Sequence, residues 1–370
     1  MASALNDRLL IDRRDFLRAA GVTFLSGLAP TGARAAAGAD AVFATAYQKR
    51  SGEYGVAILS ERGEVIHQAA LPDRGHDICV DPTGSRYVVF ARQPGTFAVV
   101  FDRHDHQPPV TISSVAGRHF YGHGVFSPDA SLLYATENDF DNAAGVIGIY
   151  DARDGFARIG EFPTFGVGPH EMLLMDDGVT LAVANGGIET HPDFGRAKLN
   201  IATMQPSLVF IDRRDGRLLG KHALAADLHQ LSIRHMDVDA SGALWFGCQF
   251  EGSPSLTPPL VGKARPGEGM SLIELPADVL GGLRNYVGSV AANRQAGTVA
   301  FTSPQGNSLA VLDATTGNVV ASRSLEEVCG VAPDGKAFMV TTGAGEIDLA
   351  DGAARREAAI VFDNHVLRFT

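Results

Sequence analysis

The sequence predicts an all-β protein, a seven-bladed β-propeller of four-stranded antiparallel blades. Three observations lead to this fold class: a segment with a histidine and a polar turn recurs along the chain, a second apolar segment follows each recurrence, and an alternating segment then ends on Asp. Few segments have the period of a helix. Repeated meanders of this kind are typical of propellers, because radial packing of the blades buries both faces of each sheet.

The recurring segment combines a histidine, a short apolar run and a polar turn, and we interpret it as the first strand of each blade. It occurs four times with histidine and twice without it, at residues 74–84, 121–129, 168–178, 233–242, 287–297 and 328–335.

A second apolar run follows each of these segments. With the run near the N-terminus there are seven such runs, at residues 41–46, 86–91, 132–136, 180–184, 243–247, 298–302 and 337–341. Strands that end on Asp lead into Gly155, Gly216 and Gly317, where a hairpin turn needs positive φ. Each unit therefore has the signals of a four-stranded meander.

The strand count also predicts how the ring closes. Seven second strands but only six first strands imply that the C-terminal residues 358–363 or 365–370 complete the first blade and hide its open edge. A two-sheet sandwich is the alternative fold, and it explains the sevenfold pattern less well.

The N-terminus has the pattern of a twin-arginine (Tat) export signal. Arg13 and Arg14 precede Phe-Leu, a modest apolar segment follows, and small-residue cleavage sites end at Ala35 and Ala37. The sequence thus predicts a signal peptide over residues 1–35 and a propeller domain over residues 36–370, soluble in the periplasm without a membrane anchor after cleavage. An ordinary amphipathic N-terminal helix is the alternative.

Composition limits the possible partners. The formal net charge of -11 argues against binding to nucleic acid or anionic lipid. Cys79, Cys248 and Cys329 are odd in number and each sits in an apolar run, so we expect buried single thiols. The sequence has no P-loop, haem-attachment motif, Gly-x-Ser-x-Gly or dinucleotide fingerprint, and no catalytic residue is assigned.

Several segments carry a resemblance to known proteins. The turns between third and fourth strands resemble those of YVTN, WD40-like and quinoprotein-like propellers. Residues 186–200, 204–208 and 362–365, together with the twin-arginine start, resemble an uncharacterised family of Tat-exported bacterial β-propellers, domain of unknown function 1513. Its members are often encoded beside imelysin-type iron-uptake proteins and di-haem oxidoreductases. The resemblance therefore implies a periplasmic accessory role in iron uptake with such partners, but it assigns no role to any residue.

Propeller geometry places the histidines of the first strands, and the loops after the second strands, at one mouth of the central channel. The expected metal ligands there are His76, His123, His170, His235 and Glu171. The expected ligand-binding residues are His119, Tyr121, Glu137, Asp139, His191, Asp193, Arg196 and Lys198.

The register of the repeats does not predict a perfect ring of histidines. Alignment by the turns puts His76 and His170 in one column, and His123 and His235 in the next. Successive strand residues point to opposite faces, so a bulge would be needed to bring all four together.

Three interpretations of these histidines stay open. They are structural hydrogen-bonding groups between blades, ligands of a transition metal such as iron or copper, or acid/base groups of a hydrolase or lyase with an acidic partner. A non-catalytic scaffold for protein interactions is a further alternative for the whole molecule.

Overall fold

The computed structural model describes residues 31–32, 35–36, 39–40, 42–103, 107–349, 354–356 and 360–369. The predicted export motif at Arg13 and Arg14 lies outside the described residues. Within the described part of the chain, no helix has both the length and the apolar character needed to span a bilayer.

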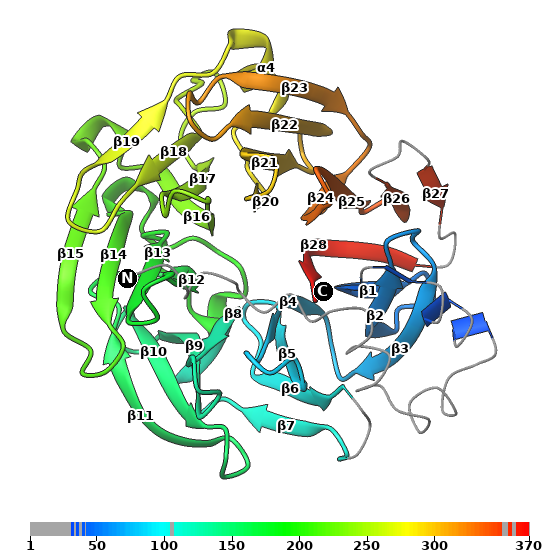
Figure 1. The fold of residues 1–370 in the computed structure, drawn as a ribbon. Helices are drawn as coiled ribbons and strands as arrows, with labels where there is room; N and C mark the ends of the chain where they lie inside the picture. Colours follow the sequence, from blue (N-terminus) through cyan, green and yellow to red (C-terminus); the bar gives the residue numbers. More distant parts are fainter. Residues whose placement is uncertain are drawn as a thin grey trace, which may run out of the picture.

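Seven four-stranded antiparallel sheets are arranged radially around a common centre (Figure 1). The predicted propeller is therefore confirmed, and the sandwich alternative is excluded. The innermost strands are β4 (Gly75–Val80), β8 (Arg118–Phe126), β12 (Pro169–Leu174), β16 (Leu231–Val238), β20 (Ser289–Asn293), β24 (Val328–Asp334) and β28 (Ile360–Arg368).

The remaining strands follow outward in each blade. The second strands are β5 (Arg86–Ala91), β9 (Leu132–Asp139), β13 (Thr180–Asn185), β17 (Leu244–Phe250), β21 (Thr298–Ser303), β25 (Ala337–Thr342) and β1 (Val42–Lys49). The third strands are β6 (Phe97–Asp102), β10 (Ala144–Asp151), β14 (Ser207–Asp212), β18 (Val261–Ala264), β22 (Ser308–Asp313), β26 (Glu346–Asp348) and β2 (Tyr54–Ser60). The outer strands are β7 (Val110–Ser113), β11 (Ala157–Pro163), β15 (Leu218–Ala223), β19 (Met270–Ile273), β23 (Val319–Ser324), β27 (Ala354–Arg356) and β3 (Val65–Leu71).

The helical elements between the strands are short. They are η1 (Pro192–Phe194), η2 (Ile201–Thr203), η3 (Ala226–Leu228) and α4 (Ala277–Gly282).

Burial changes from the inside of a blade to its outside. All six residues of β13 and all six of β14 are buried, whereas β11 alternates between exposed and half-buried positions. Middle strands are covered on both faces by neighbouring blades and so read as continuous apolar runs, while an outer strand has one solvated face. The predicted hairpin glycines are confirmed, with φ of 58° at Gly155, 73° at Gly216 and 76° at Gly317.

The C-terminus closes the ring. β28 pairs antiparallel with β1, so the first blade takes its innermost strand from the end of the chain, as the strand count predicted. The Thr45 hydroxyl donates a hydrogen bond to the carbonyl oxygen of His365 at 2.9 Å. This pairing covers an edge that an open ring would leave exposed.

The hydrophobic core lies between neighbouring blades. Trp245 is fully buried and its indole nitrogen donates to Asp239 at 2.8 Å. Cys79, Cys248 and Cys329 are buried and form no disulfide, which confirms the prediction of single thiols.

Candidate metal centre

The innermost strands that carry histidine are all irregular. The register of pairing with the second strand shifts between Gly75 and Ile78, Phe120 and Gly124, Pro169 and Glu171, Ile233 and His235, and in β28 between the partners of Thr45 and Tyr47. Of the two innermost strands without histidine, β20 pairs without a shift, whereas β24 is shifted between Val328 and Val331. A bulge inserts extra residues into one strand and re-aims side chains.

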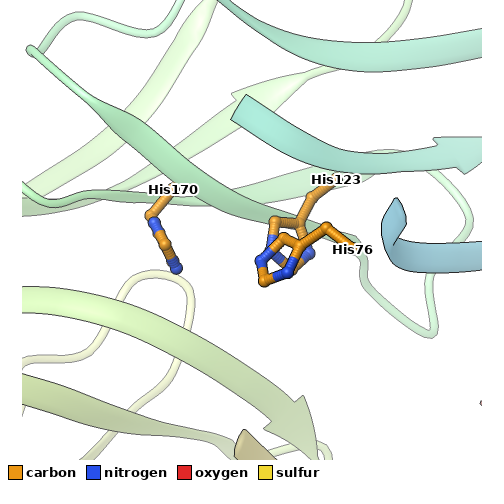
Figure 2. Close-up of side chains that lie close together, drawn as sticks. All are labelled: His76, His123 and His170. Carbon is orange, nitrogen blue, oxygen red and sulfur yellow. The ribbon is translucent and has the colours of Figure 1, made fainter. Parts of the chain in front are cut away.

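These bulges bring five imidazoles together. His76, His123, His170 and His235 converge in the channel, and His365 of β28 joins them. His76, His123 and His170 offer donor atoms within 4.8 Å of one another, and so do His123, His235 and His365. Figure 2 shows the first of these sets, reaching into a common space from β4, β8 and β12. Because both sets contain His123, they describe one cluster.

The rings pack closely. The centroid of the His365 ring lies 4.6 Å from that of His76, 4.9 Å from that of His123 and 4.8 Å from that of His235. Nε2 of His170 lies 3.3 Å from Nε2 of His235. A tetrahedral or octahedral site with metal–nitrogen bonds of about 2.1 Å has donor atoms about 3–4 Å apart, so the cluster would need to contract only slightly around an ion.

Three of the imidazoles have a carboxylate at Nδ1. Asp363 lies 3.0 Å from Nδ1 of His76, and Glu171 lies 3.0 Å from Nδ1 of His235. Asp77 lies 3.1 Å from Nδ1 of His123. Each carboxylate comes from the preceding blade. An Nδ1–H group that donates to a carboxylate leaves the lone pair of Nε2 available, which is the usual arrangement around metal-bound histidine.

Burial favours the neutral imidazole. It lowers the pKa of His76 to about 4, against the opposing effect of Asp363. Burial and the other members of the cluster hold the pKa values of His170, His235 and His365 well below the usual value for histidine. Metals bind the neutral form, so no deprotonation is needed at neutral pH.

The pKa values of two of these carboxylates, Asp363 and Glu171, are shifted in opposite directions. Burial acts to raise the pKa of Asp363, but its hydrogen bond with His76 and the charges of Arg92 and Arg74 outweigh burial and lower it. Burial raises the pKa of Glu171 well above its usual value, and the charge of Asp77 acts in the same direction. A cation in the cluster would therefore relieve the repulsion around Glu171.

Three ring nitrogens of the cluster are buried and make no hydrogen bond to a described residue: Nδ1 and Nε2 of His123 and Nε2 of His365. Nδ1 of His123 has its 3.1 Å contact with Asp77, which leaves the two Nε2 atoms without a partner. The imidazole of His123 is only 1% exposed. A buried polar atom without a partner costs about 1–3 kcal/mol, and a structural histidine would be expected to satisfy both nitrogens. A bound ion would occupy these lone pairs.

A cavity of about 540 Å³ lies at the channel mouth beside the cluster. His170 forms part of its wall, as does Asn364, the neighbour of His365. Residues after the second strands line it too, including Arg92 and Arg196, which fits the expectation that these loops share a face with the histidines.

Only some of the other expected ligand-binding residues line this cavity. Tyr121, Arg196 and Lys198 line this cavity. His119 bonds instead to Asn138 at 3.0 Å, and His191 caps η1 by accepting from the backbone of Asp193, whose side chain is exposed.

Glu137 and Asp139 form hydrogen bonds and ion pairs within the third blade. Tyr150 donates to Glu137 at 2.5 Å, and Arg158 donates to the same carboxylate at 2.9 Å. Arg118 lies 2.8 Å from Asp139. Neither carboxylate lines the cavity.

Sequence reasoning missed His365, Asp363, Arg92 and Arg234. The segment at 362–365 stood out only as part of a family resemblance. Its signal was the order Asp-Asn-His in the very strand required to close the ring.

Comparisons with known proteins support the fold and leave the activity open. The family described as "Protein of unknown function (DUF1513)" matches residues 69–369. No curated protein matches the chain. Similar solved structures include a chain of hydrazine synthase from Kuenenia stuttgartiensis, 15% identical, with a TM-score of 0.59 over 82% of this chain and 90% of that one.

The β-propeller domain of Cps50 (Swd1) from Myceliophteria thermophila is 13% identical, with a TM-score of 0.57 over 81% of this chain and 93% of that domain. At such low identity these similarities concern the fold alone.

Proposed function

Because the chain belongs to the DUF1513 family, whose description assigns no activity, we propose from the histidine cluster that this propeller binds a transition-metal ion in its channel. The observation that supports this most directly is the convergence of five imidazoles from five blades, four of them buried and that of His170 half-buried, with two Nε2 atoms unpartnered. Carboxylates at Nδ1 orient three of the rings. This donor set suits iron, copper or zinc rather than magnesium or calcium, which prefer oxygen.

Iron or copper is the candidate we favour. The twin-arginine pattern and the family resemblance support a periplasmic accessory role in iron uptake, with imelysin-like proteins and di-haem oxidoreductases as the proposed partners. The histidine cluster supports such a role, because imidazole nitrogens are good ligands of iron and copper.

The direct test is metal content. The full chain, produced with its own export signal and purified without chelator, is expected to contain about one metal ion per chain by inductively coupled plasma mass spectrometry. His123→Ala should lose most of it. His229→Ala is the control, because His229 lies outside the cluster and bonds only to the nearby carbonyl of Ala226.

Stability separates a ligand from a structural group. In the metal-free state, His123→Ala should lower the free energy of unfolding by only about 1 kcal/mol, because it loses the contact of Nδ1 with Asp77 but no hydrogen bond of Nε2. If His123 instead holds blades together, the variant is clearly destabilised without metal and there is no ion to lose. A wild-type protein that neither contains metal nor is stabilised by added Fe²⁺, Cu²⁺ or Zn²⁺ would contradict the proposal.

A second candidate is acid/base catalysis. It is favoured by the pairs His76–Asp363 and His235–Glu171, which have the geometry of a base and its orienting carboxylate. A metal-free wild type that hydrolyses or eliminates from a test panel of lactones and esters, and loses that activity in His235→Ala, would favour this candidate.

A further inference from the structure

The cavity above the histidine cluster is strongly basic. Arg92, Arg196, Lys198 and Arg234 line it, and among its described lining residues none is acidic. The protein as a whole carries a formal net charge of -11. Positive charge gathered in one hollow of an acidic protein is a feature that focuses anions toward that hollow.

Nearby carboxylates neutralise only part of this charge. Glu251 forms an ion pair with Lys198 and lies 3.3 Å from Arg234, and Asp363 lies 2.8 Å from Arg92. Arg196 has no ion-pair or hydrogen-bond partner in the part of the chain that the structure describes. Burial lowers the pKa of Arg196, and the neighbouring charges of Arg92, Arg74 and Arg234 lower it further. The charge of Arg196 is therefore repelled by neighbouring arginines, and an anion would relieve this repulsion.

A buried hydroxyl group in the cavity wall also lacks a partner. Tyr121 is 4% exposed, and its hydroxyl makes no hydrogen bond to any described residue. The hydroxyl of Thr190, also in the wall, instead accepts from Gln93 at 2.9 Å. Burial raises the pKa of Tyr121 to about 12, so it stays a donor at neutral pH. An anionic oxygen in the cavity would accept this hydrogen bond.

The size of the cavity indicates more than a simple inorganic ion. Its volume of about 540 Å³ falls within the range of about 300–1,000 Å³ typical of small-molecule sites. Gln93, Gln249 and Gln305 add amide groups to its wall. A small molecule with several oxygen-bearing groups would match both the amides and the basic side chains.

We propose that this cavity binds a small organic anion with two or more carboxylate or phosphate groups, placed beside His170 so that its oxygens complete the coordination of the ion. The second part rests on the proposed metal site, while the first rests on the basic lining and Tyr121. The protein would then hold its metal as a complex with an oxygen-rich anion.

The test uses the full chain stripped of metal with a chelator and then dialysed. Citrate is titrated by isothermal calorimetry, with inorganic phosphate as the simpler anion. Citrate should bind more tightly than phosphate, and its affinity should fall as salt is raised. Arg196→Gln and Tyr121→Phe should each weaken citrate binding by about tenfold, the effect of losing one hydrogen bond to a charged group. Arg153→Gln, on an exposed hairpin turn between β10 and β11, is the control.

The outcomes distinguish this inference from the metal proposal. Citrate binding by metal-free protein, weakened in Arg196→Gln, supports the anion site even if no metal is ever found. A protein that holds metal but does not bind citrate or phosphate, or binds them equally well in Arg196→Gln and Tyr121→Phe, overturns the anion site and leaves the metal proposal intact. Tyr121→Phe removes an unpartnered hydroxyl, so a loss of affinity in that variant cannot be assigned to a broken internal hydrogen bond.

Discussion

Among individual residues, Asp77 is the carboxylate expected to orient His123 in the proposed metal site. Its Oδ2 atom lies 3.1 Å from Nδ1 of His123, and it comes from the blade before. Such a partner fixes the ring orientation and raises the basicity of the other nitrogen, and its loss typically lowers metal affinity by about 10- to 100-fold. Asp77→Asn should show a drop of this size in competition with a chromophoric chelator.

The same substitution at an exposed acid of the channel-mouth loops provides the control. The side chain of Asp193 is 83% exposed, so Asp193→Asn should leave the affinity unchanged. Equal affinities in the two variants would show that Asp77 does not orient a metal ligand.

At the scale of the strand, the bulge of β8 depends on a glycine. Gly122 has φ of 107°, and a Cβ atom there would lie 2.7 Å from Cδ2 of His76. Gly122→Ala should therefore cost about 1–3 kcal/mol of stability through backbone strain and also displace His76, lowering metal content. Chemical denaturation and metal analysis would measure the two effects.

Gly155→Ala is the matched comparison. Gly155 also has positive φ, at 58°, but a Cβ atom there would meet nothing within 4 Å. It should lose some stability and no metal. If Gly122→Ala keeps its full metal content, the close approach to His76 is unimportant for the cluster.

The irregular pairing of the inner strands could not be predicted from the sequence. Repeats, turn glycines and the count of seven second strands were sufficient for the propeller and for its closure. Strict alternation along a strand separated His76 from His123, because a bulge leaves no regular signal in one sequence. His365 was missed because residues 366–370 do not contain the polar turn that marks the other first strands.

For the whole molecule, the ring is held by its last strand. Deleting residues 365–370 removes part of β28 from its pairing with β1 and opens the first blade. The truncated protein should have a markedly lower thermal midpoint, since an exposed edge and a lost strand affect both neighbouring blades. An unaltered midpoint would contradict closure by β28.

His365→Ala distinguishes closure from metal binding in this experiment. It keeps the backbone pairing of β28 with β1 and the hydrogen bond from the Thr45 hydroxyl to the His365 carbonyl, but removes a metal-ligand atom from the cluster. In the metal-free state its midpoint should stay near that of the wild type, whereas metal content should fall.

Location in the cell is a prediction from the sequence alone. The pair Arg13 and Arg14 should direct export, so an Arg13→Lys, Arg14→Lys double variant should stay in the cytoplasm. Fractionation with immunodetection measures this. Unchanged accumulation in the periplasm would show that another signal is used.

The joining of β1 and β28 has a consequence for biosynthesis. Thr45 and His365 are separated by 320 positions, so a nascent chain displays four of the five cluster histidines long before the fifth leaves the ribosome. Until β28 has been synthesised, the first blade lacks its inner strand and the cluster lacks His365. If the cluster binds metal as proposed, chains that stop before β28 should retain less metal than chains that include it.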